Sequence, residues 1–251
     1  MTSASPSTRP RNFTTWADYQ IRRLRKFVEE VGASTLLAGR TLRAMFTTRF
    51  DTNEFIYQLE QLGVRSLAIA AATAIFVGIV MTIQFAVSME AFGAKDTLGR
   101  VIAVSEAREL APSLTALVVG SRIAAGIAAE LGSMTVTEQV DAIRALGADP
   151  IRKLVVPRLV ACVVIMPLIT FVAFILGMFS SMLVAALSYG TPMEFFFSTA
   201  LAALRINDFI SGVSKTPFIG FLSAILGCHF GHQPRGGTEG VGRSTTRSVV
   251  V

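Results

Sequence analysis

The stretch Glu130–Pro150, ELGSMTVTEQVDAIRALGADP, is a polar segment between two long apolar parts of the chain. Thr135 and Glu138 have the spacing of a capping box, in which each side chain bonds a free backbone N–H at a helix start. We therefore predict a short helix from about residue 136 to residue 146. Apolar residues recur along it at helical spacing, and a glycine and a proline follow where helices usually stop: Val136, Val140, Ile143, Leu146, Gly147 and Pro150.

This predicted helix is too short to cross a membrane. Its length is roughly 16 Å, whereas the hydrocarbon core of a bilayer is about 30 Å thick. Glu138 and Asp141 near its start and Arg144 near its end suit the helix dipole. The pattern predicts a surface helix, which is either a plain capped loop helix or a docking element for a partner protein.

The composition is that of an integral membrane protein. Of 251 residues, 52% are hydrophobic and 16% charged, and the mean hydropathy is +0.57. The net charge of +6 does not indicate nucleic-acid binding, because the basic residues flank apolar runs. Cys162 and Cys228 lie inside apolar runs, so no disulfide framework is indicated.

Four apolar runs predict transmembrane helices, at about residues 62–89, 98–129, 155–188 and 209–230. Before them, residues 1–19 are expected to be a disordered tail. A basic amphipathic stretch at about residues 19–46 predicts one or two helices lying in the membrane interface, with a calmodulin-type target helix as the alternative. Pro192–Ile206 predicts a further interfacial helix on the opposite side.

The distribution of Lys and Arg predicts the topology. The N-terminal region, the segment Glu130–Pro150 with its flanks, and the C-terminal tail are basic, whereas the alternate loops hold little beyond Lys95, Arg100 and Arg205. The basic sides are therefore expected to be cytoplasmic, and the short helix at 136–146 with them.

Charged residues inside the apolar runs are candidate functional groups, because such charges pair or line a wet cavity. We expect Glu109 to pair with Lys215, or else with Arg108 or Arg122, in the outer part of the membrane. The sequence leaves two roles open for these charged residues: they hold the helices together, or they edge a cavity that accepts a polar headgroup. Small residues also recur every four positions, and predict close helix packing within or between subunits: Gly120, Ala124, Ala128, Gly132 and, beside them, Ser121, Ala125, Ala129, Ser133.

Catalytic motifs do not appear in the sequence. It has no GxxxxGK[ST] phosphate loop, GxSxG elbow or HExxH pair, so we expect no ATP hydrolysis and no enzyme activity from this chain itself. Cys228, His229 and His232 lack the fourth ligand of a tetrahedral metal site, and neither a metal nor another cofactor is expected.

Three long motifs carry a family resemblance: RELAPSLTALVVGSRIAAGIAAELGSM, EQVDAIRALGADPIRKLVVPR and RGGTEGVGRSTTRSVV. In this order they resemble the MlaE (YrbE) permease family of Mce-type lipid ABC transporters, over residues from Arg22 to the end. The resemblance implies an all-α permease domain at 20–251, in the bacterial inner membrane. It also implies a homodimer that rests on cytoplasmic ATPases through the short coupling helix. With a periplasmic Mce-domain protein, it would move phospholipids between the inner and outer membranes.

The resemblance also assigns roles to residues. The ATPase-coupling segment would comprise Glu130, Gly132, Met134, Glu138, Gln139, Ala142, Leu146, Gly147, Asp149 and Pro150. The lipid pathway would include Arg108, Glu109, Lys215 and Arg243. Family members continue into a further C-terminal membrane helix, which a sequence ending at Val251 does not include, either as a fragment or as a protein without that span.

Other functions remain open from the residues alone. Apolar walls do not encode a headgroup, so the cargo could be a sterol, a fatty acid or a toxic organic compound. A second alternative is a carrier that is driven by an ion gradient in place of ATP hydrolysis and uses Glu109 as its proton site. A scaffold protein that transports nothing is the third.

Overall fold

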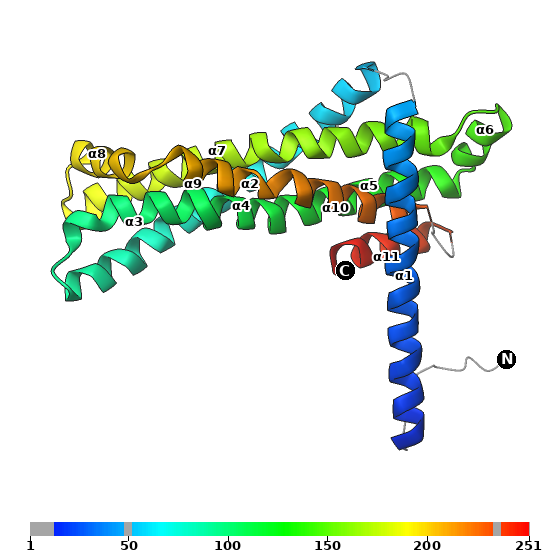
Figure 1. Ribbon diagram of the computed structural model, residues 1–251, viewed down its shortest axis with the longest axis horizontal. Helices are drawn as coiled ribbons and strands as arrows, with labels where there is room; N and C mark the ends of the chain where they lie inside the picture. Colours follow the sequence, from blue (N-terminus) through cyan, green and yellow to red (C-terminus); the bar gives the residue numbers. More distant parts are fainter. Residues whose placement is uncertain (1–12, 48–51, 233–236, 251) are drawn as a thin grey trace.

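The computed structural model describes residues 13–47, 52–232 and 237–250, which form helices with no strand among them (Figure 1). Four segments are long and apolar enough to cross a membrane: Thr52–Ala91, Lys95–Val136, Ile151–Tyr189 and Ile206–Gly231. Each contains one predicted span and extends beyond it at both ends. The predicted class, an all-α integral membrane protein with four spans, is confirmed.

Each span is built from one or more helices. The first is α2 (Thr52–Ala91). The second contains η1 (Lys95–Thr97), α3 (Leu98–Ser105), η2 (Glu106–Leu110), α4 (Ala111–Leu114), η3 (Thr115–Val119) and α5 (Gly120–Val136). The third contains η4 (Ile151–Val155) and α7 (Val156–Tyr189), and the fourth α9 (Ile206–Val213) and α10 (Lys215–Gly231). Shorter helices lie between or after the spans: α6 (Gln139–Ala145), α8 (Met193–Ala203) and α11 (Gly237–Val250).

The bundle has two distinct ends (Figure 1). Helices α1, α6 and α11 lie at one end, called the α6 end below, and α8 lies at the other, called the α8 end. α8 falls within the stretch predicted as an interfacial helix, and its position opposite α6 agrees with the order of the spans.

The N-terminal helix α1 (Phe13–Thr47) is a single helix that lies crosswise to the spans at the α6 end (Figure 1). It starts within the stretch 1–19 expected as a tail, and residues 1–12 lie outside the described ones. Ile21, Leu24, Val28 and Leu36 are exposed along it. An amphipathic helix with bare apolar side chains, crosswise to the spans, is suited to the plane of the membrane surface.

The first row of small residues packs inside this chain. Gly120, Ala124, Ala128 and Gly132 are buried on α5, which faces α10 and α11. A Cβ on Gly227 of α10 would lie 2.7 Å from the carbonyl oxygen of Ala124. Small residues are therefore required at this crossing. The second row, which begins at Ser121, is only partly covered or exposed.

Candidate functional site

Charged groups gather at η2, one of three short π-helical segments in the spans. Pro112 follows η2 and has no N–H, so the carbonyl of Arg108, four residues earlier, loses its α-helical donor. Lys215 Nζ donates to this carbonyl at 3.1 Å and to Glu109 Oε1 at 2.8 Å. The predicted Glu109–Lys215 pair is thus present, and it joins the second span to the fourth.

Arg108 makes a different pair from the one considered for it. Its Nε lies 3.5 Å from Oδ1 of Asp208, at the start of α9. Asp208 also accepts a bond from the backbone N–H of Arg205 at 3.3 Å, which fixes the carboxylate at the helix start. The remaining candidate, Arg122, donates to Ser66 Oγ at 2.7 Å. Arg122 therefore ties α5 to α2.

The same segment holds a buried carboxyl that sequence reasoning missed. Glu106 is 3% exposed, and its Oε2 has no hydrogen-bond partner among the described residues. A Cβ on Gly177 of α7 would lie 2.5 Å from Glu106 Oε1, so only glycine admits the side chain. An acidic residue three positions before Glu109, in an apolar run, was the signal available in the sequence.

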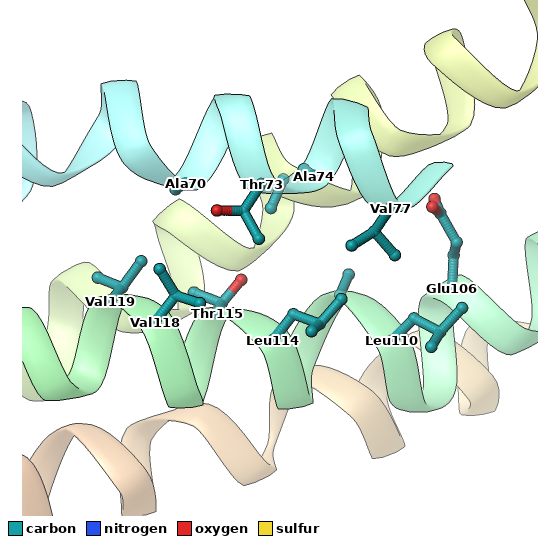
Figure 2. Close-up of a pocket in the computed structure, with 12 residues that line it drawn as sticks. Ala70, Thr73, Ala74, Val77, Glu106, Leu110, Leu114, Thr115, Val118 and Val119 are labelled. Carbon is teal, nitrogen blue, oxygen red and sulfur yellow. The ribbon is translucent and has the colours of Figure 1, made fainter. Parts of the chain in front are cut away.

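Glu106 borders a small cavity between α2 and the second span (Figure 2). The cavity has a volume of about 20 Å³, and Thr73 and Thr115 supply its other polar side chains. That volume is enough for one water molecule, which needs at least two polar partners. Apart from these groups the walls are aliphatic, including Val77 and Leu114 (Figure 2).

The short helix predicted at 136–146 is present, but its predicted start is wrong. α5 continues to Val136, and Thr135 Oγ1 donates back to the Leu131 carbonyl at 2.8 Å. α6 begins at Gln139, and Glu138 precedes it in the left-handed region at φ 59° without a side-chain cap. The capping box therefore does not form, because its threonine belongs to the preceding helix.

The structure divides the predicted coupling residues into two groups. One group is exposed on or beside α6: Glu138, Gln139, Ala142, Leu146, Gly147 and Asp149. Leu146, a large apolar side chain at the C-terminal end of α6, is 85% exposed. The second group supports the segment from inside: Gly132 packs on Val241 of α11, Met134 packs against the core, and Pro150 is buried.

The last predicted coupling residue, Glu130, belongs to an ion pair that anchors the segment. Its Oε1 accepts from Arg158 Nη2 at 2.7 Å, and Arg158 is 2% exposed. Arg158 Nη1 also donates to the Leu154 carbonyl at 2.9 Å. The pair therefore joins the end of the second span to the start of the third, on both sides of α6.

Arg243 does not lie with the other predicted pathway residues. It is exposed on α11, where it pairs with Glu239 at 2.8 Å. Since α11 packs on α5 near Gly132, Arg243 belongs to the α6 end. Glu109 lies 23 positions before Gly132 on the same span, a rise of roughly 35 Å at helical spacing.

Comparisons of the sequence with known proteins identify the family. The sequence model of a family described as "Permease MlaE" matches residues 55–251. A protein of Synechocystis named "Probable ABC transporter permease protein" is 38% identical over 218 residues, covering 87% of this chain and 83% of the relative. A Rickettsia typhi protein of the same description is 33% identical, covering 90% of this chain and 87% of the relative.

A chloroplast protein of Arabidopsis thaliana, "TRIGALACTOSYLDIACYLGLYCEROL 1", is 37% identical over 216 residues. The match covers 86% of this chain but 62% of that relative. Since the family pattern spans most of the chain and these relatives align with nearly all of it, the chain belongs to the MlaE family and is an ABC transporter permease.

Proposed function

We propose that this permease moves phospholipids between the inner and outer membranes of a bacterial cell, driven by a separate cytoplasmic ATPase that docks on α6. It works as a homodimer in the inner membrane, with a periplasmic Mce-domain protein receiving or delivering the lipid. The α6 end faces the cytoplasm, in line with its excess of basic residues.

The observation that carries this proposal is the construction of the α6 end. α6 projects beyond α1 (Figure 1), with Leu146 bare at its tip. The Glu130–Arg158 pair holds the two spans that flank it. A movement imposed on α6 would therefore reach the second and third spans together. A partner protein that covers Leu146 together with the polar side chains around it would remove this apolar side chain from water, which favours docking.

The α8 half of the bundle offers features that suit an amphipathic cargo. Glu109, Lys215 and Arg108 are accessible and can exchange bonds with a polar headgroup, whereas Asp208 is mostly covered. A groove of about 250 Å³ between α7 and α8 is almost wholly apolar and suits an acyl chain. Phe174 of this groove packs edge-on against Phe209, next to Asp208. The name of the Arabidopsis relative contains a glycolipid, which supports a lipid cargo but not a particular headgroup.

The homodimer is supported by the second row of small residues. Ser133 is exposed and Ser121, Ala125 and Ala129 are only partly covered, which leaves a row of small side chains on α5 that another helix can approach. Such rows let helices of two subunits approach closely. The mass of the permease in lipid nanodiscs tests this, since a single chain would contradict the dimer.

Lipid movement itself is tested in native membrane vesicles that contain the permease together with its ATPase and Mce-domain partners. Transfer of fluorescent phosphatidylglycerol to acceptor liposomes is measured with ATP and, separately, with a proton gradient alone. We expect transfer with ATP only. Transfer that runs on the gradient without ATP would contradict the proposal and would favour an ion-coupled carrier, for which Glu106 offers a buried carboxyl without a hydrogen-bond partner on Oε2 in the described chain.

A further inference from the structure

A second cavity lies at the α6 end, away from the Glu109–Lys215 pair. It has a volume of about 310 Å³ and is bounded by α1, α6, the start of the third span and the end of α10. Its lining brings together residues from four separate parts of the sequence. A volume of this size is typical of sites for small molecules and headgroups.

Cationic and ring-nitrogen groups line this cavity. Arg40 comes from α1 and Arg144 from α6, and the rings of His229 and His232 come from the end of α10. Arg40 has no hydrogen bond or ion pair with another residue in the described part of the chain. Arg144 Nη1 bonds Asp141 Oδ1 at 3.0 Å, which uses one of the five N–H donors of a guanidinium.

The imidazole of His232 is held in place by the backbone. Its Nδ1 donates to the Cys228 carbonyl at 2.8 Å, because a carbonyl can only accept. Nε2 is then the ring nitrogen left for a ligand. Burial lowers the pKa of His232, so the two arginines supply the positive charge at neutral pH.

The acidic groups nearby do not neutralise both arginines. Asp141 is paired with Arg144 on α6. Glu30 of α1 lies 4.0 Å from Arg247 of α11. Arg40 therefore faces the cavity as a cation without a counter-ion among the described side chains, which suits an anionic ligand.

The other walls of the cavity are apolar. Ala33, Leu36 and Leu37 of α1 and Ile151 line the cavity. Leu36 is also exposed and continues the apolar side of α1, which lies crosswise to the spans (Figure 1). A ligand in this cavity thus meets both arginine side chains and apolar side chains.

We propose that this cavity binds the phosphate of an anionic phospholipid from the leaflet on which α1 lies, with Arg40 and Arg144 as the charged donors. The bound lipid would join α1 to α6 and so stabilise the end on which a partner would dock. The site does not depend on the proposed transport, since it lies at the opposite end from the Glu109–Lys215 pair. A soluble phosphate ester shares the charge of this ligand but would gain nothing from the leucines.

The test is lipid binding to the delipidated full chain in detergent, followed by native mass spectrometry. Dioleoylphosphatidylglycerol is titrated against dioleoylphosphatidylcholine, and inorganic phosphate is added as a competitor. We expect tighter binding of phosphatidylglycerol and no displacement by millimolar phosphate. Arg40→Gln should weaken its binding about tenfold, as expected for the loss of a charge-assisted bond.

Matched variants separate the site from general charge effects. Arg22→Gln removes an exposed charge from the same helix outside the cavity and should leave binding unchanged. Arg40→Lys should retain more lipid binding than Arg40→Gln. Leu36→Ser should weaken the binding of the lipid but not that of inorganic phosphate. Equal binding by Arg40→Gln and the unmodified chain would overturn the proposal. If inorganic phosphate displaces phosphatidylglycerol and Leu36→Ser has no effect, the site binds a soluble phosphate. That result would overturn the proposal that its ligand is a lipid.

Arg40 is exposed and makes no bond in the described chain, so Arg40→Gln should fold normally. Its thermal unfolding without lipid should match that of Arg22→Gln. If Arg144→Gln fails to fold because it breaks the pair with Asp141, the Arg40 variants still decide the proposal.

Discussion

The Glu130–Arg158 pair shows how one buried charge fixes the position of the segment that carries α6. Arg158 is buried from all sides and Glu130 is its only carboxylate partner recorded in the described chain. The Arg158 Nε atom has no hydrogen-bond partner in the same part of the chain. Breaking this pair would leave Arg158 as a buried charge without a partner, so its loss should lower the stability of the fold more than the loss of an exposed ion pair.

Glu130→Ala should lower the free energy of unfolding by about 3 kcal/mol, the lower end of the range for such pairs, because Glu130 itself is partly exposed. Arg158→Met should cost less, since it removes the charge together with its need for a partner. Chemical unfolding in detergent measures both. Glu29→Ala, which breaks the exposed Arg25–Glu29 pair, is the control and should cost less than about 1 kcal/mol. If Glu130→Ala lowers the free energy of unfolding by no more than Glu29→Ala does, the buried pair does not anchor the segment.

The Glu109–Lys215 pair is accessible, so its proposed importance concerns cargo more than folding. Glu109→Gln and Lys215→Ala should each lower ATP-driven lipid transfer about tenfold, as expected for a lost contact with a charged headgroup. The swap Glu109→Lys with Lys215→Glu restores the ion pair with reversed polarity but removes the bond that Lys215 donates to the Arg108 carbonyl. We expect the swapped chain to assemble normally and to transport poorly. Normal transfer by both single variants would refute the pathway role of this pair.

At the scale of elements, the crossing of α5 and α10 depends on glycine. Gly227→Ala would place a methyl group 2.7 Å from a backbone oxygen of Ala124, which cannot rotate away. The helices must separate, at a cost of about 1–3 kcal/mol in unfolding free energy. The thermal unfolding temperature of the variant measures this loss.

Gly39→Ala is the matched control, because it lies in helix α1 with no atom within 4 Å of the new Cβ. Alanine favours a helix over glycine by about 0.5–1 kcal/mol, so this change should be neutral or stabilising. Equal thermal unfolding temperatures for Gly227→Ala and Gly39→Ala would mean that the packing of α5 on α10 does not limit stability.

The elements that the sequence predicted best are those set by hydropathy and length. The four spans and the helix near Phe196 follow from runs of apolar residues, and the short helix after the second span follows from helical periodicity. Helix starts were harder, because Thr135 has equal local reasons to cap α6 or to finish α5. The helix that packs against the small residues of α5 could not be predicted either, because the spacing of residues on one helix does not show which helix faces them.

Within the candidate site, the sequence predicted one ion pair of two. Glu109 and Lys215 stood out as opposite charges in apolar runs, and they are joined. Asp208 was missed because it lies at a span boundary, where acidic residues are common. The burial of Glu106 depends on Gly177, about seventy positions away, and only the packing of α7 on the second span reveals it.

At the scale of the whole molecule, the two ends have different chemistry. The α6 end carries the crosswise α1, the projecting α6 and the arginine-lined cavity, whereas the accessible ion pairs and the apolar groove lie in the half nearer α8. The spans connect the two, and the second and third are joined at their α6 ends by Glu130 and Arg158. This arrangement suits a permease that receives energy at one end and handles cargo at the other.

The most direct test of this account is co-purification of the tagged permease from native membranes, with bound proteins identified by mass spectrometry. Leu146→Ser changes an 85% exposed side chain at the C-terminal end of α6 and should leave the fold intact. Ile206→Ser is the control, since Ile206 is 80% exposed at the start of the fourth span, away from α6. We predict that an ABC ATPase is recovered with the unmodified chain and with Ile206→Ser, and is lost with Leu146→Ser. Equal recovery of the ATPase with both variants, or no ATPase with the unmodified chain, would contradict the coupling role of α6.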